Sequence, residues 1–137
     1  MGAEHYPKVN FKWPVVIKNG ENPIEGVTLT LNPNQAYILC AKPLKLYEVL
    51  EIIIDVPDSD SSISATAEVV FSNIYGPDDQ ISPRGMIVRF LEISSDDRKI
   101  IARKAFEHLK SKEIDTLKLE ALQTIIIGQD EIEPKAA

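Results

Sequence analysis

Six short segments with β-type patterning, all before residue 94, constrain the fold of this chain more than any other feature. In order they read WPVVI, IEGVTLTL, AYILC, EVLEIIIDVP, ISATAEVVFSNI and GMIVRFLEI. Stretches rich in turn-forming residues separate them, including KNGENP, NPNQ, DSDSS and YGPDDQISPRG. Six strands at such short and regular spacing predict a mainly β domain, built as a sandwich or a closed barrel.

Alternation within two of these segments predicts which side chains share a face. In the second segment one face is predicted to carry Val27, Leu29 and Leu31, and the opposite face Thr28 and Thr30. In the fifth segment the shared face carries Ile63, Ala65, Ala67 and Val69. The pair Asn19-Gly20 predicts a hairpin between the first two strands, because both residue types tolerate positive φ.

After residue 94 the apolar period changes from two to about four. Ser94 and Ser95 are good N-cap residues, and Asp96 and Asp97 complement the positive end of a helix dipole. The apolar positions that follow at helical spacing are Ile101, Ala102, Ala105, Phe106 and Leu109. This pattern predicts an amphipathic helix packed on the barrel.

The C-terminal segment allows two interpretations. A second helix over 113–127 would place Ile114, Leu117, Ala121 and Ile125 on one face, whereas QTIIIG alone is typical of a strand. An apolar helix face must pack on the barrel or on another copy, so this segment also predicts a homodimer. The chain then divides into an arm at 1–11, a barrel with its closing helix at 12–112, and an extension at 113–137.

Charge and motif content exclude several function classes. A net charge of −6 argues against nucleic-acid binding, and no apolar run is long enough to cross a membrane. The single cysteine, Cys40, and the absence of an apolar signal core predict a cytoplasmic location. His5 and His108 lack metal-ligand spacing, and no phosphate loop or nucleophile motif occurs. We therefore expect no metal site and no enzyme activity.

The helix after residue 97 carries a local excess of positive charge on this acidic chain. Four of its cations form a candidate surface for an acidic partner: Arg98, Lys99, Arg103 and Lys104. The alternative interpretation is an ordinary solvated helix face.

The order of these pieces resembles a known family. The sequence RGMIVRFLEISSDDRKII contains a G-x-x-V-R-F pattern, formed by Gly85, Val88, Arg89 and Phe90, that leads into the helix. WPVVI fits an opening strand, and AKPLKLYEVLEIIIDVP fits the segment before a long middle strand, with Tyr47 where glycine is usual. The chain resembles the PilZ domain from about Tyr6 to Leu109. That resemblance implies a six-stranded antiparallel barrel, a C-terminal helix and the bacterial second messenger cyclic di-GMP as ligand.

PilZ domains bind cyclic di-GMP through R-x-x-x-R in the arm and D/N-x-S-x-x-G in the turn after the second strand. An arginine fork pairs with guanine edges or phosphate, and the turn glycine lets the backbone approach closely. In this chain the two arginine positions hold Glu4 and Lys8, and the three turn positions hold Thr30, Asn32 and Gln35. Every motif position therefore departs from the family pattern.

These departures predict a non-enzymatic PilZ-like adaptor that works through protein contacts, with weak or no binding of cyclic di-GMP. The resemblance implies a role in type IV pili, motility or surface polysaccharide, and Tyr37 or Tyr47 would join the partner surface if exposed. One alternative is a true cyclic di-GMP receptor whose contacts come from Lys8, Lys12, Asn32, Asn34 and Arg84 or Arg89. A second alternative is an unrelated small β-barrel that binds another ligand.

Overall fold

The computed structural model describes residues 6–20, 22–74, 76–81, 83–110 and 116–127. Six strands form the body of the protein: β1 (Pro14–Lys18), β2 (Ile24–Asn32), β3 (Gln35–Leu39), β4 (Val49–Asp55), β5 (Ser62–Ser72) and β6 (Gly85–Ile93). Two helices follow, α1 (Ser95–Lys110) and α2 (Thr116–Ile126). The predicted mainly β class with a closing helix is confirmed.

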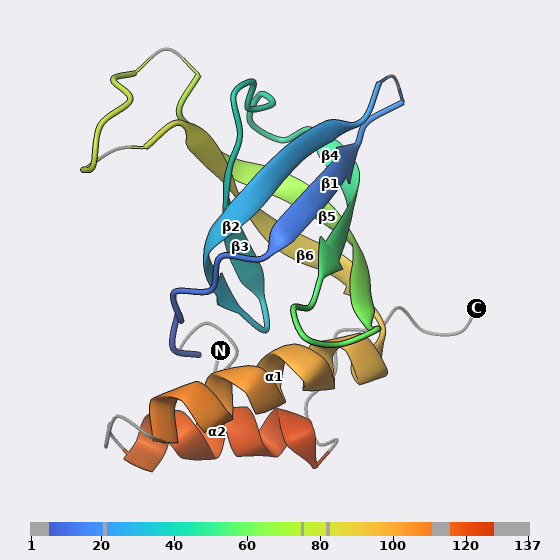
Figure 1. Cartoon of the computed structure of the whole chain (residues 1–137), viewed down its shortest axis with the longest axis vertical. Coiled ribbons are helices and arrows are strands. Elements are labelled where there is room, and N and C mark those ends of the chain that lie inside the picture. Colours follow the sequence, from blue (N-terminus) through green and yellow to red (C-terminus); the bar gives the residue numbers. More distant parts are fainter. Residues whose placement is uncertain (1–5, 21, 75, 82, 111–115, 128–137) are drawn as a thin grey trace.

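The strands close into an antiparallel barrel in the order β1-β2-β3-β6-β5-β4. Closure comes from pairing between β1 and β4, where Val15 lies opposite Ile54. Gly20 has a φ of 86° in the β1–β2 hairpin, in line with the predicted Asn-Gly turn. Figure 1 shows α1 lying across one end of the barrel, with α2 beneath it, while the loops before β4 and between β5 and β6 lie at the opposite end.

Alternating residues of the strands fill the barrel interior. The four predicted inward residues of β5 are all buried: Ile63, Ala65, Ala67 and Val69. They pack with the inner faces of the other strands and with Ile101 of α1 in one hydrophobic core. The period-two pattern therefore identified the buried face of β5 correctly.

The predicted faces of β2 are wrong at Thr28. A shift in the β2–β3 register between Thr28 and Thr30 breaks the alternation, so that Thr28 and Leu31 are both buried. The Thr28 hydroxyl donates to the Phe11 carbonyl and accepts the Trp13 amide at 2.9 Å. This satisfied hydroxyl explains how a polar side chain lies inside the barrel, which alternation alone could not predict.

The helices form a second small core with the N-terminal arm. Ser94 caps α1 as predicted, because its hydroxyl accepts the Asp97 amide at 3.0 Å. Ala102, Ala105 and Leu109 of α1 pack with Leu122 and Ile125 of α2 and with arm residues. A helix therefore forms at 116–126, and the strand interpretation of QTIIIG is wrong.

Of the predicted face of this second helix, Ile125 is buried and Ala121 is half-buried. Ile114 and the Leu117 side chain lie outside the part of the chain that the structure describes. No helix in the described ranges has the length and apolar content to cross a membrane.

Candidate functional site

The turn between β2 and β3, where the resemblance places a ligand loop, is held by its own side chains. Asn32 is only 4% exposed. Its Oδ1 accepts the amides of Asn34 at 2.7 Å and Gln35 at 2.9 Å, and its Nδ2 donates to the Tyr6 carbonyl at 3.3 Å. Asparagine is well suited to this role, because its short side chain can bond the backbone two residues further on. The Asn32 side chain thus fixes the turn and attaches the arm to it.

Arg98 of α1 reaches the same turn from the other side. Its side chain is 1% exposed, its Nε donates to the Pro33 carbonyl at 3.3 Å, and its Nη2 donates to Asn34 Oδ1 at 2.6 Å. The guanidinium carbon also lies 5.5 Å from the centroid of the Tyr6 ring. Arg98 therefore joins three segments that are far apart in the sequence: the arm, the β2–β3 turn and the helix.

This burial corrects the predicted partner surface, in which Arg98 was an exposed cation. The residues at positions 98, 101, 105 and 109 recur every three or four residues, so Arg98 lies on the buried face of α1. Lys99 and Lys104 are half-buried and Arg103 is exposed. None of these three forms an ion pair with a residue that the structure describes.

The arm runs beside β2 rather than lying free. Val9 and Leu31 exchange two backbone hydrogen bonds, at 3.0 Å and 2.9 Å. Lys8 and Lys12 are exposed, and Thr30 and Gln35 are half-buried. Glu4 lies outside the described residues. The structure thus brings Asn32, Asn34 and Gln35 together with the described part of the arm.

The two candidate arginines lie at different places along β6: Arg84 directly precedes the strand, and Arg89 lies at its middle. Arg89 is the register partner of Gln35, and its Nη2 forms an ion pair with Glu68 at 2.8 Å. Arg84 precedes β6, and its Nη1 donates to the carbonyls of Asn73 at 2.9 Å and Ile74 at 2.6 Å. Arg89 thus belongs to the neighbourhood of the turn, whereas Arg84 organises the β5–β6 loop.

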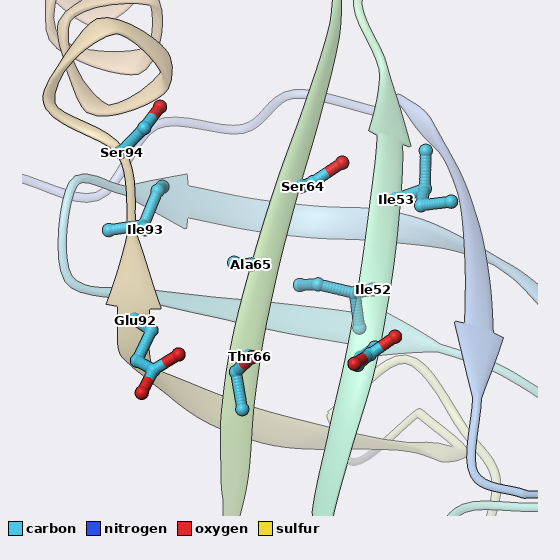
Figure 2. A pocket seen from close by; sticks show the side chains of 9 residues that line it. Ile52, Ile53, Ser64, Ala65, Thr66, Glu92, Ile93 and Ser94 are labelled. Atoms are coloured by element: carbon cyan, nitrogen blue, oxygen red, sulfur yellow. The ribbon is translucent and has the colours of Figure 1, made fainter. Parts of the chain in front are cut away.

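A hollow of about 430 Å³ lies on the outer surface of β4, β5 and β6. Figure 2 shows Thr66 and Glu92 on neighbouring strands of this hollow, with Ser64 further along β5. Glu51 and Glu92 are the register partners of Thr66 on its two sides. The described lining residues carry carboxylates and hydroxyls but no cation. Such a surface repels an anionic nucleotide.

The residues most suited to nucleophilic or metal chemistry do not converge. Cys40 is buried, and burial raises the pKa of its thiol, which reduces its nucleophilic thiolate form. His108 lies edge-on to the ring of Phe11 at 5.4 Å, and His5 lies outside the described residues. The described ranges contain no group of three metal-ligating side chains.

Comparison with known proteins yields a match at the level of fold. No family model matches the chain, and no curated protein matches it in sequence. A solved structure of the Bacillus subtilis inhibitor of motility (MotI/DgrA) matches with a TM-score of 0.68 and 19% sequence identity. The match covers 80% of this chain and 52% of that one, so the chain spans about half the length of the B. subtilis protein. The likeness supports a PilZ-like fold.

Proposed function

We propose that this protein is a non-enzymatic PilZ-like regulatory module that acts through protein contacts and binds cyclic di-GMP weakly or not at all. The observation that carries the proposal is the internal hydrogen bonding of the β2–β3 turn. Asn32 Oδ1 is bonded to two turn amides, and Asn34 Oδ1 and the Pro33 carbonyl are bonded to Arg98. A ligand that used the side-chain oxygen of Asn32 or Asn34 would have to displace these bonds.

The composition of the arm supports the same proposal. Glu4 and Lys8 stand at the two positions where the resemblance implies arginine forks. A lost bidentate contact to guanine costs roughly 1–3 kcal/mol, and a carboxylate near phosphate adds repulsion. Two such losses weaken binding by several orders of magnitude.

The regulatory context rests on the fold likeness. The B. subtilis protein is an inhibitor of motility, and we carry over to this chain only a role in regulating motility or a related surface process, type IV pili among them. The exposed or half-buried cations Lys99, Arg103 and Lys104 of α1 are the proposed contact for an acidic partner.

The proposal includes a homodimer through 113–127, but fewer residues of this segment are available for the contact than its apolar pattern predicts. Ile125 lies in the core between α1 and α2, so it is not available to a second copy. The contact would use residues left outside, among them Ile127, which is 60% exposed. Sedimentation velocity of wild type and of the Ile127→Ser variant measures this self-association. A wild-type protein that stays monomeric at all concentrations would contradict the homodimer.

Calorimetric titration with cyclic di-GMP tests the proposed function. We expect no saturable heat with ligand up to about 100 µM, which corresponds to a binding free energy weaker than roughly −5.5 kcal/mol. The Asn32→Ala and Lys8→Ala variants serve as controls for a weak signal. Micromolar binding that both variants weaken would refute the proposal and identify a receptor with divergent contacts.

A further inference from the structure

Five exposed apolar side chains cluster at the barrel end that lies away from the helices. They are Leu46 (48% exposed), Tyr47 (73%), Val49 (52%), Val70 (40%) and Phe71 (45%). Backbone hydrogen bonds bring them together, because the Tyr47 amide donates to the Val69 carbonyl at 2.8 Å and the Val69 amide donates to the Glu48 carbonyl at 3.0 Å. Figure 1 shows this end of β4 and β5 opposite to α1 and α2. We call these five residues the Tyr47 patch. Contiguous apolar patches of this kind mark interaction sites.

Tyr47 adopts a backbone conformation that a bulky residue rarely takes. Its φ is 70°, in a turn where the Glu48 amide donates to the Lys45 carbonyl at 3.3 Å. Glycine is the residue normally favoured at such a position, because it has no Cβ to clash. The Lys45 amide also donates to Glu48 Oε2 at 3.0 Å, so the turn is held on both sides. Strain that its surroundings maintain in this way is typical of functional positions.

A groove of about 550 Å³ runs beside the patch, between the turn before β4 and the loop after β5. Leu46, Phe71, Ile74 and Pro77 contribute its apolar walls. This volume holds one or two large side chains. Lys45 is the one ionisable side chain among the described lining residues.

Closure of the barrel determines how a partner can dock here. β4 is paired on both sides, and β5 is paired with β4 as far as Glu68 and joined to the turn before β4 at Val69, so the unpaired end of β5 is too short an edge for an added strand. A partner must therefore bind through side chains inserted into the groove, which is how an amphipathic helix docks. Lys45 at the rim adds a preference for an acidic side chain next to the apolar anchors.

The size of the patch argues against a second copy as the occupant. Five side chains about half exposed present on the order of 400 Å² of apolar surface. A stable dimer needs roughly 800 Å² from each partner. The patch therefore matches one helix of another protein, bound transiently.

We propose that the Tyr47 patch and its groove bind an amphipathic helix of a partner protein, with apolar side chains in the groove and an acidic residue beside Lys45. This inference deepens the proposed function and rests on one part of it, namely that the protein acts through protein contacts. Cyclic di-GMP binding in calorimetry would overturn that function and leave the patch untouched.

Selection from a displayed library of random peptides of about 15 residues, against the full chain, tests the docking site. We expect the enriched peptides to carry apolar residues at i, i+3, i+4 and i+7 with a flanking acid. Fluorescence anisotropy with the best enriched peptide then measures binding to the variants. Tyr47→Gly and Phe71→Ser are each expected to weaken binding by about tenfold or more, as truncation of a hot-spot residue does.

The controls separate this surface from others. Ile127→Ser removes a similarly exposed apolar residue at the end of α2, and it should leave binding unchanged. The double variant Arg103→Ala/Lys104→Ala should also bind normally. The proposal would be refuted if no peptide is enriched, or if Tyr47→Gly leaves binding intact. It would also be refuted if binding is lost only in the Arg103→Ala/Lys104→Ala variant. Self-association that Tyr47→Gly abolishes would also refute it, because the occupant would then be a second copy.

Discussion

Replacement of Arg98 by alanine tests the role of α1 in holding the arm and the turn. Arg98 is the buried side chain through which α1 hydrogen-bonds the β2–β3 turn, at Pro33 and Asn34. Its guanidinium also lies over the Tyr6 ring. Alanine removes all three contacts and leaves two acceptors near a void at the end of the barrel.

The expected loss of stability is the balance of opposing effects. Each hydrogen bond from the cation contributes about 1.5–3 kcal/mol, and the contact with the Tyr6 ring about 0.5–2 kcal/mol. Removal of a buried charge recovers part of its desolvation penalty, which is several kcal/mol. We therefore expect a net loss of about 3 kcal/mol, out of a total of roughly 7–20 kcal/mol for a chain of this length. The corresponding fall in Tm is roughly 12 °C.

Urea denaturation and thermal melting of wild type and variant measure this loss. Arg103→Ala is the matched control, because it removes the same side chain from an exposed position of the same helix and should change stability by less than about 0.5 kcal/mol. Arg98→Ala should also speed hydrogen exchange at the paired amides of Val9 and Leu31. Equal stability of the two alanine variants would refute the assignment of Arg98 as the link between helix, turn and arm.

Three further predictions concern the rest of the barrel. Tyr47→Gly should raise the free energy of unfolding in urea by about 1 kcal/mol, because it relieves the positive φ, and Tyr47→Ala should give no such gain. Gly85→Ala should lower the free energy of unfolding by roughly 2–3 kcal/mol in the same assay, because the new methyl group would collide with the Ile38 carbonyl. Burial, together with Asp78 for Tyr37, raises the pKa values of Cys40 and Tyr37, so the unfolded chain releases these two protons first. The stability that these two groups contribute is fully present below their pKa values in the unfolded chain. It should be lost as pH rises from about 8.5 through their pKa values in the folded protein. In Tyr37→Phe the free energy of unfolding should therefore fall less steeply with pH.

Sequence patterns identified the elements whose burial follows a simple period. The inward face of β5 and the buried face of α1 both follow from regular spacing of apolar residues, because each packs one continuous face on the core. The faces of β2 do not follow, since a register shift between Thr28 and Thr30 breaks the alternation and the buried Thr28 hydroxyl bonds the carbonyl of Phe11 and the amide of Trp13. Both partners lie in a segment 15–17 residues away, which no local pattern specifies.

The candidate site shows a similar division. The sequence predicted the strand–turn–strand frame from Asn32 to Gln35, and the structure contains it. The charge of Arg98 predicts an exposed position, whereas its spacing from Ile101 and Leu109 places it on the buried helix face. Helix periodicity takes precedence over charge when polar partners such as Pro33 and Asn34 can satisfy a buried guanidinium.

The contacts of Arg98 offer a way to tell a lost ligand site from a masked one. A lost site has no guanine contacts, whereas a masked site has them but is kept closed by the hydrogen bonds of Arg98. If the turn must open before a ligand can bind, the observed affinity is the intrinsic affinity multiplied by the fraction of molecules that are open. An opening cost of about 3 kcal/mol reduces that fraction to about 1 in 150, so a micromolar site would bind at roughly 0.1 mM.

Calorimetry of Arg98→Ala with cyclic di-GMP therefore separates the two cases. A masked site should gain roughly two orders of magnitude in affinity, whereas a turn without guanine contacts should stay silent in both proteins. Because Thr30, Asn32 and Gln35 all depart from the family pattern and Asn32 is bonded within the turn, we expect silence. A gain would mean that Arg98 holds closed a site that this protein still possesses.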